Sequence, residues 1–387
     1  MYYTKLNQSI KIGCFDASRV SLIMANNGGL NLSNYELIEL NKTSITECEV
    51  DIFMAHGYEL REYFAVDYET KISNNQKIKC DTFVIDLMGE YWDSDERIHI
   101  FNIIRELNIK CNNIKLVGIY DTDDPITMEG VDIFKYDLPF LFFIGPHNDT
   151  FNEWNNPKPN GNASVWMGGK YKESKEKVFL CLNNQMRPHR VVLIERMIKS
   201  DKIWEHGIIS SKVGTYEKHS SPLIKVDDIT EDGTEKRFGL QTQFSNKSYI
   251  DIATETSFTT RFITEKSVKP FMLLQFPILF GYSGIVQYFR DKGFDMFDDI
   301  IDHSYDKIDS NRLIEKSDAI VTELERLCDL DWDKLNKDNK HRLEVNQKLL
   351  NKYNLESKRT EAIAKFIFGD NYTFSESVLF DNFIKFI

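Results

Sequence analysis

The sequence predicts an α/β protein with two successive domains built on parallel sheets. The chain has 387 residues, more than a single typical domain of about 100 to 150 residues holds. Short apolar runs rich in strand-forming residues alternate with segments of helical periodicity in both halves of the chain, as βαβ units do. A stretch rich in Pro, Gly and Asn, residues 145–177, separates the two regions and is typical of a linker.

The first α/β region starts with an apolar run at residues 80–87, which we expect to be a strand. A helix is expected over 93–107, because an aspartate provides an N-cap and apolar residues then recur at helical spacing. The run 114–120 is the next expected strand, closed by the turn-like residues 121–125, and 140–144 is another. A strand, a helix and a strand in this order favour a parallel sheet.

The same alternation resumes after the linker. Strands are expected over 178–182, 249–253 and 277–281. A helix is expected to begin at Pro188, because proline is favoured in a first helical turn, and a short helix over 285–290 follows Gly284. Beyond residue 310 the spacing of leucine and isoleucine is helical, and the apolar tail 362–387 needs a surface to cover.

These elements predict four parts of the chain. They are an N-terminal α/β domain over 1–150, a linker over 151–176, a second α/β domain over 177–330, and C-terminal helices over 331–387. Two domains joined in this way are expected to enclose a cleft, the default position for a ligand.

Composition excludes several classes of function. The 48 Lys and Arg against 60 Asp and Glu leave a net charge of −12, which repels nucleic acid and anionic membranes but leaves a local basic groove open. The six cysteines are scattered without the spacing of zinc ligands, so we expect reduced thiols and no metal. The N-terminus lacks the shape of a signal peptide and no apolar run approaches the ~20 residues of a membrane span. We expect a cytoplasmic protein with no membrane partner.

Residues 253–266 are the most informative segment, because a strand runs into a Ser/Thr-rich loop and Glu265-Lys266 then opens a helix. Backbone N–H groups at a helix start favour an anion, and Lys266 adds a positive charge. A carboxylate at this point can accept hydrogen bonds from the two hydroxyls of a ribose. These are the groups that bind a nucleoside diphosphate. The alternative is that Glu265 only begins the helix and Lys266 is solvated.

Several motifs in order resemble known families. One motif resembles the donor-binding motif of fucosyltransferases, where a Glu-Asn-Ser turn precedes Thr-Glu-Lys. In this chain Glu255 is followed, after the same interval of nine residues, by Glu265-Lys266. The chain is also similar to sequences of tailed phages and bacteria that are assigned as glycosyltransferases. The motifs shared with that group are Leu-Cys-Leu-Asn at 180–183, Arg-Pro-His-Arg at 187–190, Thr-Glu-Thr-Ser-Phe at 254–258, Thr-Glu-Lys-x-x-Lys-Pro at 264–270, and the segment 294–305. The resemblance covers roughly residues 176 to 350.

The resemblance implies a GT-B architecture, in which two Rossmann-like domains face a cleft and the second holds most of the nucleotide sugar. Residues 1–150 would then be the acceptor side and 177–330 the donor side. The donor-binding residues implied in this way are Arg187, Arg190, Glu255, Ser257, Glu265 and Lys266. Among them, Glu265 would bind the ribose, and Lys266 with Arg190 would neutralise the diphosphate. His189, between the two arginines, is expected to be structural.

The sequence departs from the fucosyltransferase motif at two positions. Thr256 stands where that motif has Asn, and Arg261 stands where it has an acid. These differences argue against GDP-fucose as the donor while leaving another sugar nucleotide of UDP or GDP type.

An inverting transferase also needs a general base, normally Asp or Glu. Asp86 and Glu90 follow a predicted strand of the first domain and are the candidates, against the alternative that they are ordinary turn or capping carboxylates. Asp121 and Asp123 form an Asp-x-Asp pair, with which GT-A glycosyltransferases hold a divalent metal. The nearby Pro125 favours a simple turn there.

The sequence therefore predicts a metal-independent glycosyltransferase without a cofactor, whose partners are a nucleotide sugar and an acceptor. The acceptor is open between a glycan, a small metabolite and a hydroxymethylated base in phage DNA, which would have to be flipped out of the duplex. Two alternatives stay open: a non-catalytic nucleotide- or sugar-binding protein, and a metal-dependent GT-A transferase that uses Asp121 and Asp123.

Overall fold

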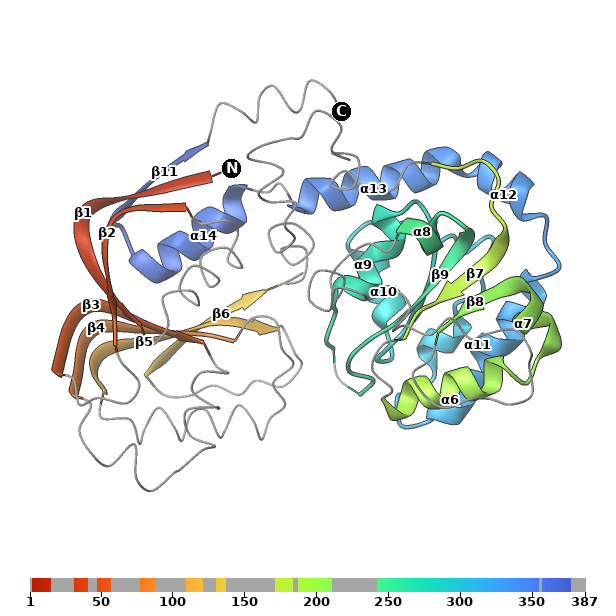
Figure 1. Cartoon of the computed structure of the whole chain (residues 1–387), viewed down its shortest axis with the longest axis horizontal. Helices are drawn as coiled ribbons and strands as arrows, with labels where there is room; N and C mark the ends of the chain where they lie inside the picture. The colour runs from red at the N-terminus through yellow and green to blue at the C-terminus, as the bar shows by residue number, and fades with distance from the viewer. Residues whose placement is uncertain are drawn as a thin grey trace. The chain divides into compact units, whose positions relative to one another are not determined.

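The computed structural model describes residues 2–14, 31–40, 47–56, 77–87, 109–120, 130–136, 171–183, 187–210, 242–259, 261–354 and 357–376. The chain divides into two compact units. The first contains Met1–Phe142 and Glu356–Ile387, and the second contains Phe143–Leu355. Each unit has its own sheet (Figure 1).

The first unit is built on a sheet that is parallel except at one edge. Its described elements are β1 (Tyr2–Cys14), β2 (Asn31–Glu39), β3 (Glu47–His56), β4 (Lys77–Asp86), β5 (Ile109–Tyr120), β6 (Val131–Tyr136), α14 (Ser357–Phe368) and β11 (Tyr372–Glu376). The strand order is β11-β1-β3-β4-β5-β6, and β2 also pairs with β1. All of these pairings are parallel apart from that of β1 with β11.

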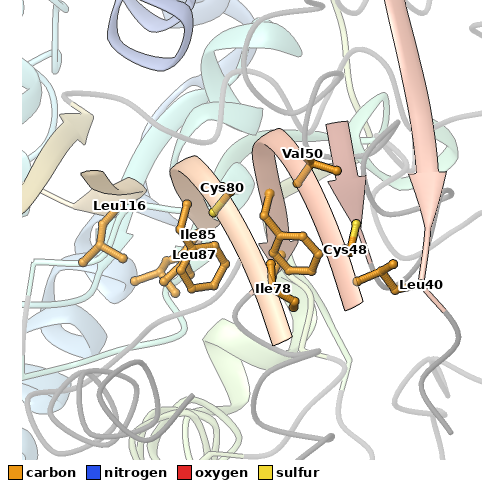
Figure 2. Close-up of a cluster of buried hydrophobic side chains, with 11 residues drawn as sticks. Leu40, Cys48, Val50, Ile78, Cys80, Ile85, Leu87 and Leu116 are labelled. Atoms are coloured by element: carbon orange, nitrogen blue, oxygen red, sulfur yellow. The ribbon is translucent and has the colours of Figure 1, made fainter. Parts of the chain in front are cut away.

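The core of the first unit lies on strands β3, β4 and β5 (Figure 2). In β4, residues 82–85 are buried one after another, the pattern of a strand in a parallel sheet that is covered on both faces. The rings of Phe53 and Phe83 pack with their centroids 5.7 Å apart. Cys48 and Cys80 contribute small apolar side chains, and none of the six cysteines, all of them described, forms a disulfide.

The second unit alternates strands and helices around a four-stranded sheet. Its first described elements are β7 (Lys177–Cys181), α6 (Pro188–Met197), α7 (Asp201–His206), β8 (Gly207–Ile209), α8 (Thr242–Ser245) and β9 (Ser248–Thr254). They are followed by α9 (Glu265–Met272), β10 (Phe276–Phe280), α10 (Ile285–Asp291), a 3₁₀ helix (Ser304–Lys307), α11 (Leu313–Leu327), α12 (Trp332–Asp338) and α13 (Lys340–Asn354). The strand order is β10-β9-β7-β8, and every pairing is parallel. Helix α11 packs against α6, and α13 packs against α9.

The predicted α/β class with parallel sheets is confirmed. The strands expected at 80–87, 114–120, 178–182, 249–253 and 277–281 are β4, β5, β7, β9 and β10. The helices expected at Pro188, at 285–290 and beyond residue 310 are α6, α10 and α11 with its successors. The helix expected over 93–107 and the strand over 140–144 lie outside the described residues. The predicted cleft between the domains stays a prediction.

The C-terminal part of the chain differs from the predicted division. Residues 331–387 were expected to form helices after the second domain, but only α12 and α13 belong to the second unit. Helix α14 packs against β1 and β11, and β11 pairs antiparallel with the start of β1. The physical reason is that the N–H and C=O groups at the edge of β1 need partners, which β11 supplies. Lys115 of β5 also donates to the carbonyl oxygens of Phe366 (2.5 Å) and Ile367 (3.4 Å), near the end of α14.

Within the part of the chain that the structure describes, we find no helix with the length and apolar character needed to cross a membrane.

Candidate functional site

The carboxyl ends of the parallel strands of the second unit meet at one edge of the sheet. Three described segments continue from this edge: residues 255–259 and 261–264 of the loop after β9, residues 182–183 after β7, and residues 281–284 after β10. In open parallel sheets this edge is where ligands bind. Of the predicted donor-site residues, Glu255 and Ser257 lie in the loop after β9, and the others lie at or beside the starts of α6 and α9, namely Arg187, Arg190, Glu265 and Lys266.

Glu255 organises the loop after β9. It is wholly buried, and its backbone N–H donates to the carbonyl of Phe280 at the end of β10 (2.8 Å). Its carboxylate accepts hydrogen bonds from the N–H (2.9 Å) and hydroxyl (2.6 Å) of Thr264, from the N–H of Thr256 (3.2 Å) and from the hydroxyl of Ser267. One side chain therefore joins both ends of the loop to the first turn of α9. This role accounts for the nine-residue interval that the sequence shows between Glu255 and Glu265.

Lys266 lies at the start of α9, where this loop ends. Thr264 is the N-cap of α9, and its hydroxyl accepts a hydrogen bond from the N–H of Lys266 (3.3 Å). The ammonium of Lys266 donates to the hydroxyls of Thr264 (3.3 Å) and Thr256 (3.4 Å). A half-buried cation and the N-terminus of an eight-residue helix therefore coincide, which favours an anion. The backbone of Glu265 begins α9, and its side chain lies outside the described residues.

Arg190 is in the first turn of α6, as predicted, and it is buried. Its Nη2 donates to the carbonyl oxygens of Thr254 and Glu255, both at 2.9 Å. These carbonyls lie at the end of β9, where the sheet no longer supplies donors, so the guanidinium satisfies them. Arg190 thus holds the strand end that carries the loop, and its contact with a diphosphate stays a prediction.

His189 supports the same strand end. Its Nε2 donates to the carbonyl of Glu255 (2.9 Å), and its ring stacks on Phe258 with centroids 5.4 Å apart. Burial lowers the pKa of His189 to about 4, so the ring is neutral at pH 7. The prediction that His189 is structural agrees with these contacts. Arg187 is exposed and precedes α6 as its N-cap residue, without a side-chain hydrogen bond to the cap, and Ser257 is half-buried in the loop.

Lys316 of α11 is a site residue that sequence reasoning missed. It is wholly buried, donates to the carbonyl of Gly281 (2.9 Å) and lies over the ring of Phe258, 5.4 Å from its centroid. Burial lowers the pKa of Lys316 to about 8. The available signal was its position four residues before Ile320, on the buried face of the helix.

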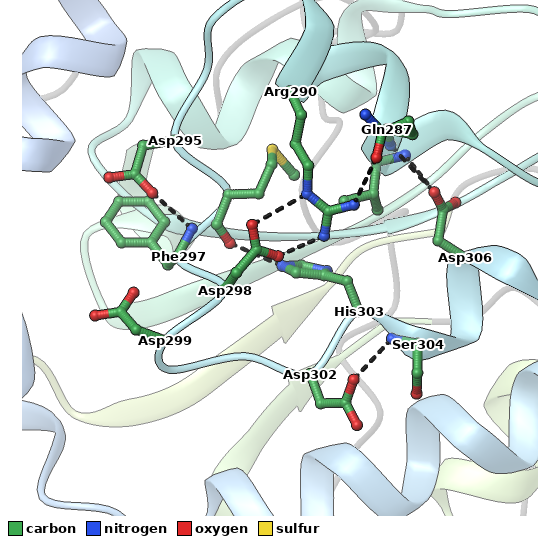
Figure 3. A network of polar contacts seen from close by, with 12 residues as sticks. Gln287, Arg290, Asp295, Phe297, Asp298, Asp299, Asp302, His303, Ser304 and Asp306 are labelled. Carbon is green, nitrogen blue, oxygen red and sulfur yellow. Dashed lines mark hydrogen bonds and ion pairs between the residues drawn. The ribbon is translucent and has the colours of Figure 1, made fainter.

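The N-terminus of α10 is closed by the chain itself (Figure 3). The carboxylate of Asp306, from the 3₁₀ helix, accepts the N–H groups of Gly284 (3.1 Å), Val286 (3.0 Å) and Gln287 (3.1 Å). An internal carboxylate therefore occupies the position that an anionic ligand would take at this helix. At this edge of the sheet, the helix start that is left to favour an anion is therefore that of α9, with Lys266.

The segment 294–305, singled out by resemblance, is held together by internal contacts (Figure 3). Arg290 pairs with Asp298, and the ring of buried His303 bonds to the carbonyl of Met296 (2.8 Å) and the hydroxyl of Tyr305 (2.9 Å). Burial lowers the pKa of His303. These contacts indicate a structural role for the segment.

The predicted catalytic residues are described only in part. Asp86 is the last residue of β4, at the carboxyl end of a parallel strand, and its side chain lies outside the described residues. Glu90, Asp121 and Asp123 also lie outside them. Among the residues that are described, no group of three or more His, Cys, Asp or Glu side chains could hold a metal ion.

No family model matches the chain, and no curated protein matches it. Its structure is similar to the crystal structure of an α1,3-fucosyltransferase, with a TM-score of 0.44 and 10% sequence identity. The alignment covers 94% of this chain and 90% of that chain. No donor, acceptor or residue role follows from a likeness of this size.

Proposed function

We propose that the protein is a glycosyltransferase that moves a sugar from a nucleotide-diphosphate sugar, of UDP or GDP type, to an acceptor hydroxyl. The observation that carries the proposal is the position of Lys266. Glu255 and Thr264 fix this cation at the start of α9, at the carboxyl edge of a parallel sheet. The ordered motifs that resemble phage and bacterial glycosyltransferases support the same donor site.

In this reaction the acceptor oxygen attacks the anomeric carbon, the bond from that carbon to the diphosphate breaks, and the diphosphate leaves with the electron pair. Lys266 and the N–H groups of α9 would stabilise the charge that develops on the diphosphate. The acceptor proton passes to a general base, for which Asp86 and Glu90 of the first unit are the candidates. We expect a GT-B mechanism without a metal.

The acceptor is open between a glycan, a metabolite and a hydroxymethylated base of phage DNA. The net charge of −12 disfavours DNA, because a duplex carries a dense array of negative phosphates. Measured transfer to hydroxymethylated DNA at physiological salt would reverse this preference.

The first prediction concerns nucleotide binding at Lys266. UDP or GDP at 100 times its dissociation constant should stabilise the protein by about 2.7 kcal/mol, read as an increase in melting temperature. Lys266→Ala should remove most of this stabilisation, because a charged hydrogen bond to phosphate contributes about 1.5 to 3 kcal/mol. Thermal unfolding with UDP, GDP, ADP, CMP and the corresponding sugars provides the measurement.

The matched control is Lys199→Ala, which removes an exposed lysine just after the far end of α6. It should leave the shift unchanged. The absence of a shift with every nucleotide would contradict the proposal. A shift without release of nucleoside diphosphate in the presence of any acceptor would favour the non-catalytic binding protein.

A further inference from the structure

Tyr282 carries a buried hydroxyl that the described part of the chain leaves unsatisfied. It is the second residue after β10, at the same edge of the sheet as Lys266, and only 8% of it is exposed. Its hydroxyl has no hydrogen-bond partner among the described residues. Buried tyrosine hydroxyls normally have a partner, and among the described residues this one is left able to bond to a ligand. Burial raises the pKa of Tyr282, which keeps the hydroxyl protonated and able to donate.

Arg261 is a cation near enough to Tyr282 to act on its hydroxyl. It belongs to the loop that Glu255 joins to α9, and its guanidinium lies over the ring of Tyr288, 5.6 Å from the centroid. Its charge acts on the Tyr282 hydroxyl and opposes the effect of burial on the pKa. A guanidinium stacked on a ring keeps its N–H groups in its own plane, where they can bind a phosphate through two hydrogen bonds.

The charges around Tyr282 favour an anionic ligand. The two carboxylates that act on its hydroxyl, Glu255 and Asp306, are each bonded to several N–H or O–H groups of the chain. Their negative charges are therefore directed at internal donors. Arg261 in the loop and Lys266 at the start of α9 are both half-buried cations. Since Asp306 closes the start of α10, a phosphate oxygen is better placed toward the α9 side.

We propose that the Tyr282 hydroxyl and the Arg261 guanidinium form a phosphate subsite, which binds the diphosphate of the nucleotide together with Lys266. The assignment of the anion to a nucleotide rests on the proposed function. The phosphate chemistry itself rests on these side chains. Tyr282→Phe is the sharpest variant, because it removes the hydroxyl and keeps the buried ring.

The experiment is calorimetric titration of the full chain with UDP, GDP, UMP, GMP and inorganic pyrophosphate. Tyr282→Phe should weaken binding of the diphosphates by about 10-fold, and Arg261→Gln by about 10-fold or more, as expected for hydrogen bonds to charged groups. Arg261→Lys keeps the charge but not the two-point contact, and should fall between Arg261→Gln and the unmodified protein. Far-UV circular dichroism and the melting temperature check that each variant folds.

Two matched controls come from other regions of the unit. Tyr171→Phe removes a hydroxyl that bonds to Asn336 near the start of β7, and Arg196→Gln removes a cation that pairs with Asp318 at the far end of α6. Both should leave every affinity unchanged.

The outcomes separate the subsite from the proposed function. Tight nucleotide binding that neither Tyr282→Phe nor Arg261→Gln weakens would overturn the subsite alone. Pyrophosphate binding that depends on both residues, without binding of any nucleotide, would support the subsite and overturn the proposed donor. An unmodified protein that binds neither nucleotides nor pyrophosphate would overturn both.

Discussion

At the scale of single residues, the second unit uses buried polar side chains to hold a loop in place. Glu255 receives four hydrogen bonds, and Arg190 and His189 donate to the carbonyls at the end of β9. A buried carboxylate without such donors would be strongly destabilising, so these contacts must form together. The resulting loop geometry holds Lys266 at the start of α9, and under the proposed function this would lower the entropy lost on binding a ligand.

His189 predicts a pH dependence of stability. Its pKa is about 4 in the folded protein against about 6.5 in an unfolded chain, so the unfolded chain binds more protons between these values. The free energy of unfolding should therefore increase by up to about 3 kcal/mol as the pH rises from about 4 to 6.5. The same stability should be lost as the pH falls through this range. Urea unfolding measured between pH 4 and pH 7.5 tests this, and His189→Gln should show a shallower slope. An identical slope in the variant would assign the dependence to other groups, such as His303.

At the scale of secondary-structure elements, helix starts distinguish the two candidate anion sites. Helix α9 begins at the Thr264 N-cap with Lys266 in its first turn, whereas α10 begins on the carboxylate of Asp306. Gly284, which precedes α10, has a φ of +94°, a conformation that glycine adopts at little cost. Helices α9 and α10 both follow parallel strands, but at α10 the carboxylate of Asp306 already satisfies the first N–H groups.

Asp306→Ala should destabilise the second unit, because the N–H groups of Val286 and Gln287 at the start of α10 would lose their acceptor, while that of Gly284 keeps the backbone carbonyl of residue 306. We expect a loss of about 2 kcal/mol in the free energy of unfolding, measured by urea denaturation. Asp309→Ala is the control, since Asp309 is exposed and its carboxylate accepts only the N–H of Asn311 among the described contacts. Equal effects of the two substitutions would contradict the capping role of Asp306.

At the scale of the whole molecule, each unit has its own sheet and core, and the chain returns to the first unit at its C-terminal end. Strand β11 pairs with β1 from Tyr2↔Glu376 to Leu6↔Tyr372. The first unit is thus built from the two ends of the sequence, while the second is continuous.

A chain that ends at Leu355 should lose stability in the first unit only. Without β11 and α14, the start of β1 loses its antiparallel partner and the covering helix, so its amide groups should exchange faster with solvent. Hydrogen exchange followed by mass spectrometry provides the measurement, with β9 and β10 of the second unit as the internal reference. Faster exchange throughout both units would contradict the division into two units.

The strands β4, β5, β7, β9 and β10 could be predicted because local apolar runs bounded by turn residues depend on neighbours in the sequence. The positions of Arg190 and Lys266 in the first turns of α6 and α9 followed from the same local signals, namely Pro188 and the Glu-Lys pair. The motif that begins at Glu255 was recognised by its resemblance to a known donor-binding motif, but the four hydrogen bonds that the Glu255 carboxylate accepts could not be predicted.

Other features depend on contacts between residues far apart in the sequence, which a linear pattern does not contain. The pairing of β11 with β1 joins residues more than 360 positions apart, and no periodicity shows which open edge a distant strand will satisfy. Lys316 reaches Gly281 only because α11 packs near the end of β10, and Asp306 caps α10 only because the chain folds back. Local sequence determined the elements and the order of the motifs. Tertiary structure decided which polar groups are satisfied internally, because burial and hydrogen bonding are properties of the folded neighbourhood.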